Sequence, residues 1–237
     1  DSYISYTIRP TKTVFETITP STYIYRRWSF DGQRLNAWND FNLEAGLRVA
    51  QTFARLSYRD AFESYADVPF SGLYSLQGSI ESQPHRAVTV SANLGGGTTI
   101  AYFLPVPERA NELSGGVAVS VKPIDRLTID SRVQTYRISD RAADTAYFDG
   151  YIARSRLQFQ ATRALSVRLV GEYNDFRKAW SISPLMTYRI SPFSLFYIGS
   201  TLNYTDWPTT LSVANAPTEW KLDQRQYFMK LQYLFQV

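Results

Sequence analysis

The chain has 237 residues, with 25 Lys and Arg against 21 Asp and Glu, one His and no Cys. The absence of Cys excludes disulfides, thiolate metal sites and Cys nucleophiles, and a single His argues against a His-rich metal centre. Aromatic residues make up 15% of the chain, yet its mean hydropathy is too low for a bundle of membrane helices. The basic residues are spread singly along the chain, which argues against a nucleic-acid partner.

Apolar and polar side chains alternate along most of the chain, which is the period of a β-strand. We expect a first strand over 3–9 and an ambiguous stretch over 13–30 around Pro20. Clear alternation then follows, and it runs through residues 41–49, 127–134, 156–161 and 165–174. Such segments reach about ten residues. This is longer than the ~5–6 residues of a typical sandwich strand, and a tilted strand of this length can cross a bilayer. No comparable stretch has the spacing of an amphipathic helix.

Short and long connections take turns between these strands. The expected short turns are 10–12, 50–52, 83–86, 122–125, 162–164 and 191–193. The expected long loops are 31–34, 60–70, 105–112, 140–147, 175–183 and 206–223. This alternation predicts an all-β, antiparallel, up-and-down transmembrane β-barrel of about 12–14 strands, forming one domain over residues 1–237.

Aromatic residues gather near the predicted strand ends, for example Trp28 with Phe30, and Tyr102 with Phe103. This placement is typical of the aromatic girdles of outer-membrane barrels. The alternative is a soluble β-sandwich that binds carbohydrate or protein through long aromatic loops. In that case the same aromatic residues would fill the core between two sheets.

The C-terminal segment carries the most specific pattern in the sequence. Every second residue there is apolar or aromatic: Tyr227, Met229, Leu231, Tyr233, Phe235 and Val237. This stripe resembles the C-terminal signal by which the barrel-assembly machinery recognises bacterial outer-membrane proteins. The chain departs from that signal because it ends in Val rather than Phe.

Four further segments resemble the C-terminal outer-membrane barrel of a family of unknown function. They are residues 122–129, 162–169, 184–192 and 228–235. Members of that family join an N-terminal carbohydrate-binding domain, similar to family nine, to the barrel. The resemblance covers the second half of the chain well and the first half loosely. It implies an envelope location, and no sugar-binding role passes to residues of this chain.

If lipid takes the apolar face, the opposite face supplies the interior. The candidate lumen-lining residues are Glu44, Arg48, Arg55, Arg59, Glu81, Asp130, Arg132, Arg154, Arg156, Arg168, Glu172 and Lys230. These charges either pair into a rigid network or line water and bias the ions that pass. Loop 206–223, with Trp207 and Trp220, is the candidate partner or plug loop, because long loops carry function. An ordinary solvent-exposed loop is the alternative.

Two features could suggest catalysis, and both have a structural explanation. His85 lies in a predicted turn with no Cys or second His as a partner. The triple glycine 95–97 lacks the following helix and the Lys-Ser/Thr pair of a phosphate loop, so a strand kink is expected. We expect no enzyme activity, no catalytic or metal site and no cofactor.

The sequence therefore predicts a barrel of the bacterial outer membrane that acts as a pore, or as an anchor and scaffold for cell-envelope components. The expected partners are outer-membrane lipid, the barrel-assembly machinery during insertion, and other envelope proteins or further barrel strands. About thirteen strands are expected, whereas single-chain bacterial barrels have an even number. We therefore expect this chain to be the C-terminal part of a longer barrel or one part of a composite barrel.

Overall fold

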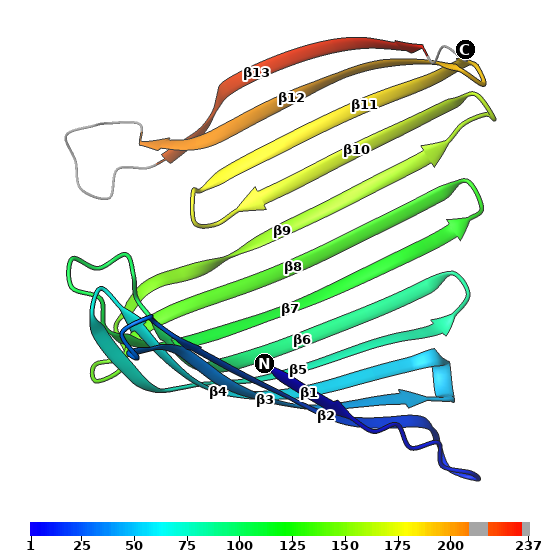
Figure 1. The fold of residues 1–237 in the computed structure, drawn as a ribbon. Helices are drawn as coiled ribbons and strands as arrows, with labels where there is room; N and C mark the ends of the chain where they lie inside the picture. Colours follow the sequence, from blue (N-terminus) through cyan, green and yellow to red (C-terminus); the bar gives the residue numbers. More distant parts are fainter. Residues whose placement is uncertain (209–217, 234–237) are drawn as a thin grey trace. The chain divides into compact units, whose positions relative to one another are not determined.

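The computed structural model describes residues 1–208 and 218–233. Within these residues, thirteen strands form one antiparallel sheet in which the order of the strands is their order in the sequence (Figure 1). Residues 1–208 and 218–233 contain no apolar helix of membrane-spanning length. The prediction of an all-β, antiparallel, up-and-down arrangement with about thirteen strands is confirmed.

The strands are long, and most exceed ten residues. Their bounds are β1 Ser2–Ser5, β2 Phe15–Trp28, β3 Arg34–Leu47, β4 Thr52–Tyr65, β5 Val68–His85, β6 Val88–Ile100, β7 Arg109–Ile124, β8 Leu127–Asp140, β9 Ala146–Gln160, β10 Leu165–Asn174, β11 Ala179–Ser191, β12 Ser194–Pro208 and β13 Thr218–Tyr233. One short 3-10 turn, Val49–Gln51, connects β3 to β4. The sheet divides into two compact units, Asp1–Val117 with Gln134–Gly150, and Ala118–Val133 with Tyr151–Val237.

The alternation of short and long connections is present only in part, because the expected long loop 175–183 is reduced to the four residues 175–178 and the expected short turn 10–12 lies in a connection over 6–14. We expected a long loop over 60–70, but β4 continues to Tyr65 and β5 begins at Val68. The two residues between them, Ala66 and Asp67, have φ angles of 49° and 63°. A pair of left-handed residues forms the tight hairpin turn whose twist matches that of the flanking strands. Because neither residue is Gly or Asn, the sequence carries no usual signal for this turn.

The ambiguous stretch around Pro20 is part of a continuous strand. Pro20 lies inside β2 opposite Leu43, and its carbonyl accepts a hydrogen bond from the backbone N–H of Tyr6. Pro20 has no backbone N–H, so it cannot donate the reciprocal hydrogen bond to the N-terminal segment. The pairing between β1 and β2 is therefore weaker at this position. This explains why β1 ends at Ser5, whereas we expected it to continue to Arg9.

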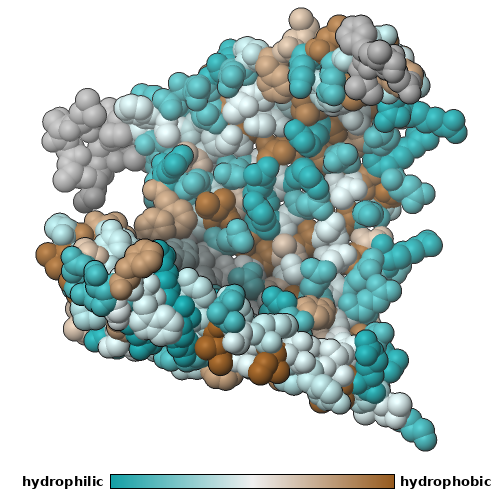
Figure 2. All heavy atoms as spheres, in the orientation of Figure 1, coloured by the Kyte–Doolittle hydropathy of each residue, from teal (hydrophilic) through white to brown (hydrophobic). Residues whose placement is uncertain are grey.

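Very few apolar side chains are buried. In the described part of the chain, six of the seven buried hydrophobic residues form two small clusters near strand ends, and no large side chain is fully buried. Large apolar residues instead lie exposed along the strands, and Figure 2 shows hydrophobic and hydrophilic side chains side by side at the surface. A soluble sandwich would bury one face of each sheet against a second sheet. The single sheet in sequence order does not have this arrangement.

Candidate functional site

The polar face of the sheet carries paired charges in the first unit. Glu44 of β3 lies directly opposite Arg55 of β4, and Asp40 lies opposite Arg59. Opposite residues of an antiparallel pair have side chains on the same side of the sheet, so both pairs form contacts. The Arg55 guanidinium binds the Glu44 carboxylate, and Arg59 donates Nε–H to Asp40 Oδ1 at 2.5 Å and Nη2–H to Oδ2 at 2.8 Å.

The second unit has two more pairs. Arg156 of β9 donates to Asp130 of β8 from both Nε and Nη2, at 3.0 and 2.6 Å, and Ser120 of β7 donates to the other oxygen of Asp130 at 2.7 Å. Arg154 contacts Glu172 of β10 at 3.3 Å. The arginine side chains of these pairs are 40% to 46% exposed, so solvent weakens each pair and their main effect is to fix geometry.

Eleven of the twelve predicted lumen residues fall into two groups. Seven of them lie in these ion pairs: Glu44, Arg55, Arg59, Asp130, Arg154, Arg156 and Glu172. The partner of Arg59 is Asp40, which was not among the predicted lumen residues. Glu81, Arg132, Arg168 and Lys230 lie on strands and have no ion pair in the described part of the chain. Arg48 is a correction, because β3 ends at Leu47 and Arg48 precedes the short turn instead of lying on a strand.

The opposite face of the first unit is an apolar belt, which we define by the rows through Ala45, Leu43 and Phe41 of β3. Leu43 lies opposite Leu56 of β4, and both side chains are about half exposed, at 46% and 50%. Belt residues therefore have neither a protein core nor a polar partner around them. Such a surface requires an apolar environment.

The belt has polar limits that give its height. It begins near Leu47 at the short-turn end and ends at Asn39, eight residues away. At that end Arg26 Nη2 donates to Asn39 Oδ1 at 2.6 Å, and Asn39 Nδ2 donates to Asp60 Oδ2 at 3.4 Å. Eight residues span about 27 Å along a strand, or about 21 Å across a layer when the strand is tilted by about 40°. This is close to the ~25 Å band of outer-membrane barrels.

The C-terminal stripe continues an apolar face in the second unit. Tyr227, Met229, Leu231 and Tyr233 lie opposite Ser200, Ile198, Phe196 and Ser194 of β12. Their exposure ranges from 57% to 72%. Lys230 lies on the other face, opposite Tyr197. The two remaining residues of the predicted assembly signal, Phe235 and Val237, lie outside the described residues.

The predicted partner loop is shorter than expected. Trp207 belongs to β12, where it pairs with Glu219, and Trp220 belongs to β13, where it pairs with Asp206. The Trp220 ring packs edge-on against Tyr173, with ring centroids 6.2 Å apart, and Tyr173 also contacts Trp180 at 5.0 Å. The two tryptophans therefore mark the ends of strands, and residues 209–217 between the strands lie outside the described part.

The connection after β10 holds its own charge pair. Lys178 Nζ donates to Asp175 Oδ1 at 2.6 Å, and the Tyr173 hydroxyl donates to the same oxygen at 3.2 Å. The hydrogen bond from Lys178 is the main cause that lowers the pKa of Asp175 below its usual value. The same contact raises the pKa of Lys178.

The two features that could suggest catalysis have structural roles. His85 ends β5, and its Nδ1 accepts a hydrogen bond from the backbone N–H of Ala87 at 3.1 Å, as in a structural turn. The glycines lie inside β6, and a Cβ on Gly97 would be only 2.0 Å from the carbonyl oxygen of Tyr74. They therefore allow β5 and β6 to approach closely. No group of three or more potential metal ligands occurs within residues 1–208 and 218–233.

No protein-family model and no curated protein matches the chain. One similar solved structure is titled "CymD monoaromatic hydrocarbon channel"; it is 9% identical, has a TM-score of 0.36, and the match covers 85% of this chain and 77% of that chain. Another is a NanC porin that is 12% identical, with a TM-score of 0.35 and coverage of 90% and 98%. At these scores, neither likeness bears on the solute or partner of this chain.

Proposed function

We propose that this chain is a β-barrel domain of the bacterial outer membrane whose polar face lines an aqueous path for small solutes. The observation that carries the proposal is the single sheet with an exposed apolar belt on one face and charges on the other. Lipid would cover the apolar side chains of the belt, and water would solvate the charged groups on the opposite face. The height of the belt agrees with a membrane-spanning sheet. The expected partners remain lipid, the barrel-assembly machinery and other envelope components.

A second candidate is an anchor or scaffold that passes no solute. The paired charges favour it, because the four arginine–carboxylate contacts include every predicted lumen carboxylate except Glu81. Such pairs hold neighbouring strands in register without a transport role. No comparable observation favours a soluble sandwich, which needs two packed sheets, because the described strands form one sheet in sequence order.

The unpaired charges give the pore a testable property. Among the twelve predicted lumen residues, Arg132, Arg168 and Lys230 lie on strands without an ion pair in the described part of the chain, against the single carboxylate of Glu81. An open lumen with this excess of basic groups prefers anions weakly. The reversal potential of the full chain in a planar bilayer, measured across a KCl gradient, should therefore indicate chloride preference.

The variant Arg132→Gln with Arg168→Gln should shift that potential towards zero, whereas Arg163→Gln in a turn should leave it unchanged. A chain that purifies as a water-soluble monodisperse protein without detergent would contradict the membrane assignment. A chain that inserts into bilayers and shows no conductance would instead support the scaffold.

A further inference from the structure

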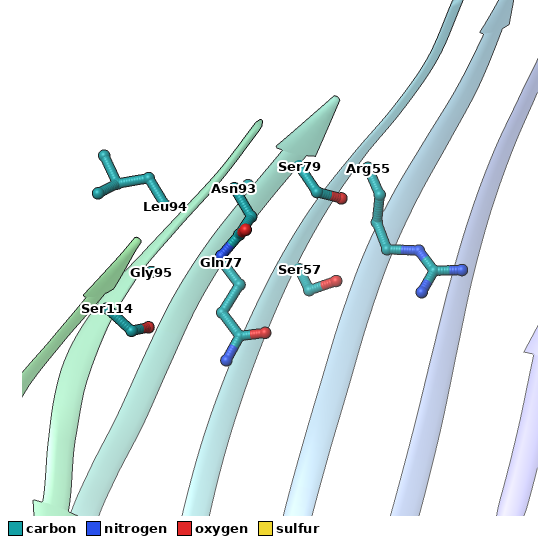
Figure 3. Close-up of a pocket in the computed structure, with 9 residues that line it drawn as sticks. Arg55, Ser57, Gln77, Ser79, Asn93, Leu94, Gly95 and Ser114 are labelled. Atoms are coloured by element: carbon teal, nitrogen blue, oxygen red, sulfur yellow. The ribbon is translucent and has the colours of Figure 1, made fainter. Parts of the chain in front are cut away.

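A hollow of about 260 Å³ lies on the polar face of the first unit. Its polar lining comes from neighbouring strands β4 to β7 and consists of Arg55, Ser57, Gln77, Ser79, Asn93 and Ser114 (Figure 3). Gly95 keeps the hollow open, because a Cβ there would lie 3.0 Å from Gln77 Cγ and 3.3 Å from Ser114 Oγ. Three serines and a glycine thus leave a recess between longer side chains.

The lining is rich in hydrogen-bonding groups that the protein does not use. Within residues 1–208 and 218–233, Ser57, Gln77, Ser79, Asn93 and Ser114 make no side-chain hydrogen bond. Hydroxyl and amide groups both donate and accept hydrogen bonds, as the hydroxyls of a sugar or polyol do. The one charged residue, Arg55, is already bound by Glu44. The hollow therefore offers polar contacts with little net charge.

The hollow lies on the cross-strand row that passes through the middle of the apolar belt on β3. Ser57 is directly opposite Asn42 on one side and Gln77 on the other. Asn42 is the chain neighbour of Leu43, which lies midway between the limits of the belt, at Leu47 and Asn39. If the polar face lines a path through the membrane, a solute meets this group of free donors and acceptors between the two limits of the belt.

We infer that the hollow is a binding site for a small, neutral, polyhydroxylated solute, namely a monosaccharide or a short polyol. This inference rests on the proposed pore function. The volume lies just below the ~300–1,000 Å³ of typical ligand pockets, which suits one sugar ring rather than a longer chain. The hydroxyl groups of such a solute can exchange their hydrogen bonds with water for hydrogen bonds with the free serine and amide side chains. No polar group of the solute or the hollow is then left without a partner.

Sugar block of the ion current tests this site. The full chain is inserted in a planar bilayer in KCl, and glucose or sorbitol is added while the current is recorded. We expect a saturable, concentration-dependent decrease of the current. The variant Gln77→Ala with Asn93→Ala should raise the half-blocking concentration at least fivefold, because it removes two hydrogen-bonding groups. Asn42→Ala, in the same cross-strand row but outside the hollow, should change it less than twofold.

The outcomes separate this inference from the proposed pore. Conductance that is blocked equally in the wild type and the double variant would overturn the sugar site and leave the pore standing. Stronger block by gluconate than by glucose would overturn the assignment of a neutral solute. If no conductance appears, the pore function is rejected. Saturation-transfer NMR of glucose with the detergent-solubilised chain then tests sugar binding independently of the pore. In that measurement, equal transfer to the wild type and to Gly95→Val, which fills the hollow, would overturn it.

Discussion

The apolar belt makes a quantitative prediction for a single charged substitution at its centre. Leu43 is four residues from each limit of the belt, at Leu47 and Asn39, and its side chain is 46% exposed on the apolar face. Under the membrane hypothesis, Leu43→Arg places a guanidinium near the middle of the hydrocarbon layer. Arg at that depth on the lipid face of a barrel costs about 2–4 kcal/mol. The folding equilibrium should therefore shift by roughly 25- to 700-fold.

The assay is denaturant-induced unfolding of the full chain in phospholipid vesicles, with the free energy of unfolding taken from the midpoint and slope. Asn42→Arg is the matched control, because it adds the same side chain one residue away on the polar face, between Asp40 and Glu44. We expect that control to change the free energy by less than about 0.5 kcal/mol. A third variant, Leu47→Arg, lies at the limit of the belt and should cost only about 0–1 kcal/mol.

Equal costs for Leu43→Arg and Asn42→Arg would contradict the assignment of one face to lipid and the other to water, because the two faces would then have the same environment. A cost that does not decrease from residue 43 to residue 47 would refute the estimate of the belt's height. The two comparisons are independent, since one varies the face and the other varies the depth.

Three other predictions concern the backbone and one loop. Gly97→Ala should destabilise the chain by about 3 kcal/mol, because its Cβ would lie 2.0 Å from the Tyr74 carbonyl oxygen, whereas Gly171→Ala meets nothing within 4 Å and should be nearly neutral in the same unfolding assay. Ala66→Asn should stabilise by about 0.5–1 kcal/mol, because Asn tolerates the left-handed conformation that Ala66 adopts; an unchanged unfolding midpoint would contradict this. The lowered pKa of Asp175 means that its contact with Lys178 stabilises the loop above about pH 4 and is lost as the pH falls through the lower folded-state pKa. An NMR titration should find the Asp175 midpoint below the ordinary value and should find it restored in Lys178→Met.

The strands could be predicted from the sequence because their side chains alternate. Residues 165–174 were expected as a strand from the alternation of Leu165, Val167 and Leu169 with polar neighbours, and β10 has those bounds. The hairpin at Ala66–Asp67 could not be predicted in this way. Its geometry depends on pairing between β4 and β5, which imposes positive φ angles on residues that do not prefer them.

The site was predicted in part. Alternation placed Glu44, Arg55 and Arg156 on polar faces, but their partners depend on the register between strands, which a single sequence does not specify. Asp40 was missed because nothing in its own strand distinguishes it from other polar residues. The hollow was missed for a related reason: Gly95, Gln77 and Ser114 come from three strands and become neighbours only after pairing. A glycine at a polar position of an alternating strand was the one signal in the sequence.

If the sheet spans a bilayer as proposed, the polar limit formed by Arg26, Asn39 and Asp60 has a consequence for the lipid around it. A belt of about 21 Å is thinner than the ~30 Å hydrocarbon layer of an ordinary phospholipid bilayer. Lipids at its edge must compress by several ångströms, at a cost of a fraction of a kcal/mol for each ångström. Vesicles of short-chain lipids remove that cost, and the bilayer of the bacterial outer membrane is itself thinner than average. In thick membranes, chains of this kind should cluster, because sharing a thinned annulus reduces the deformed area.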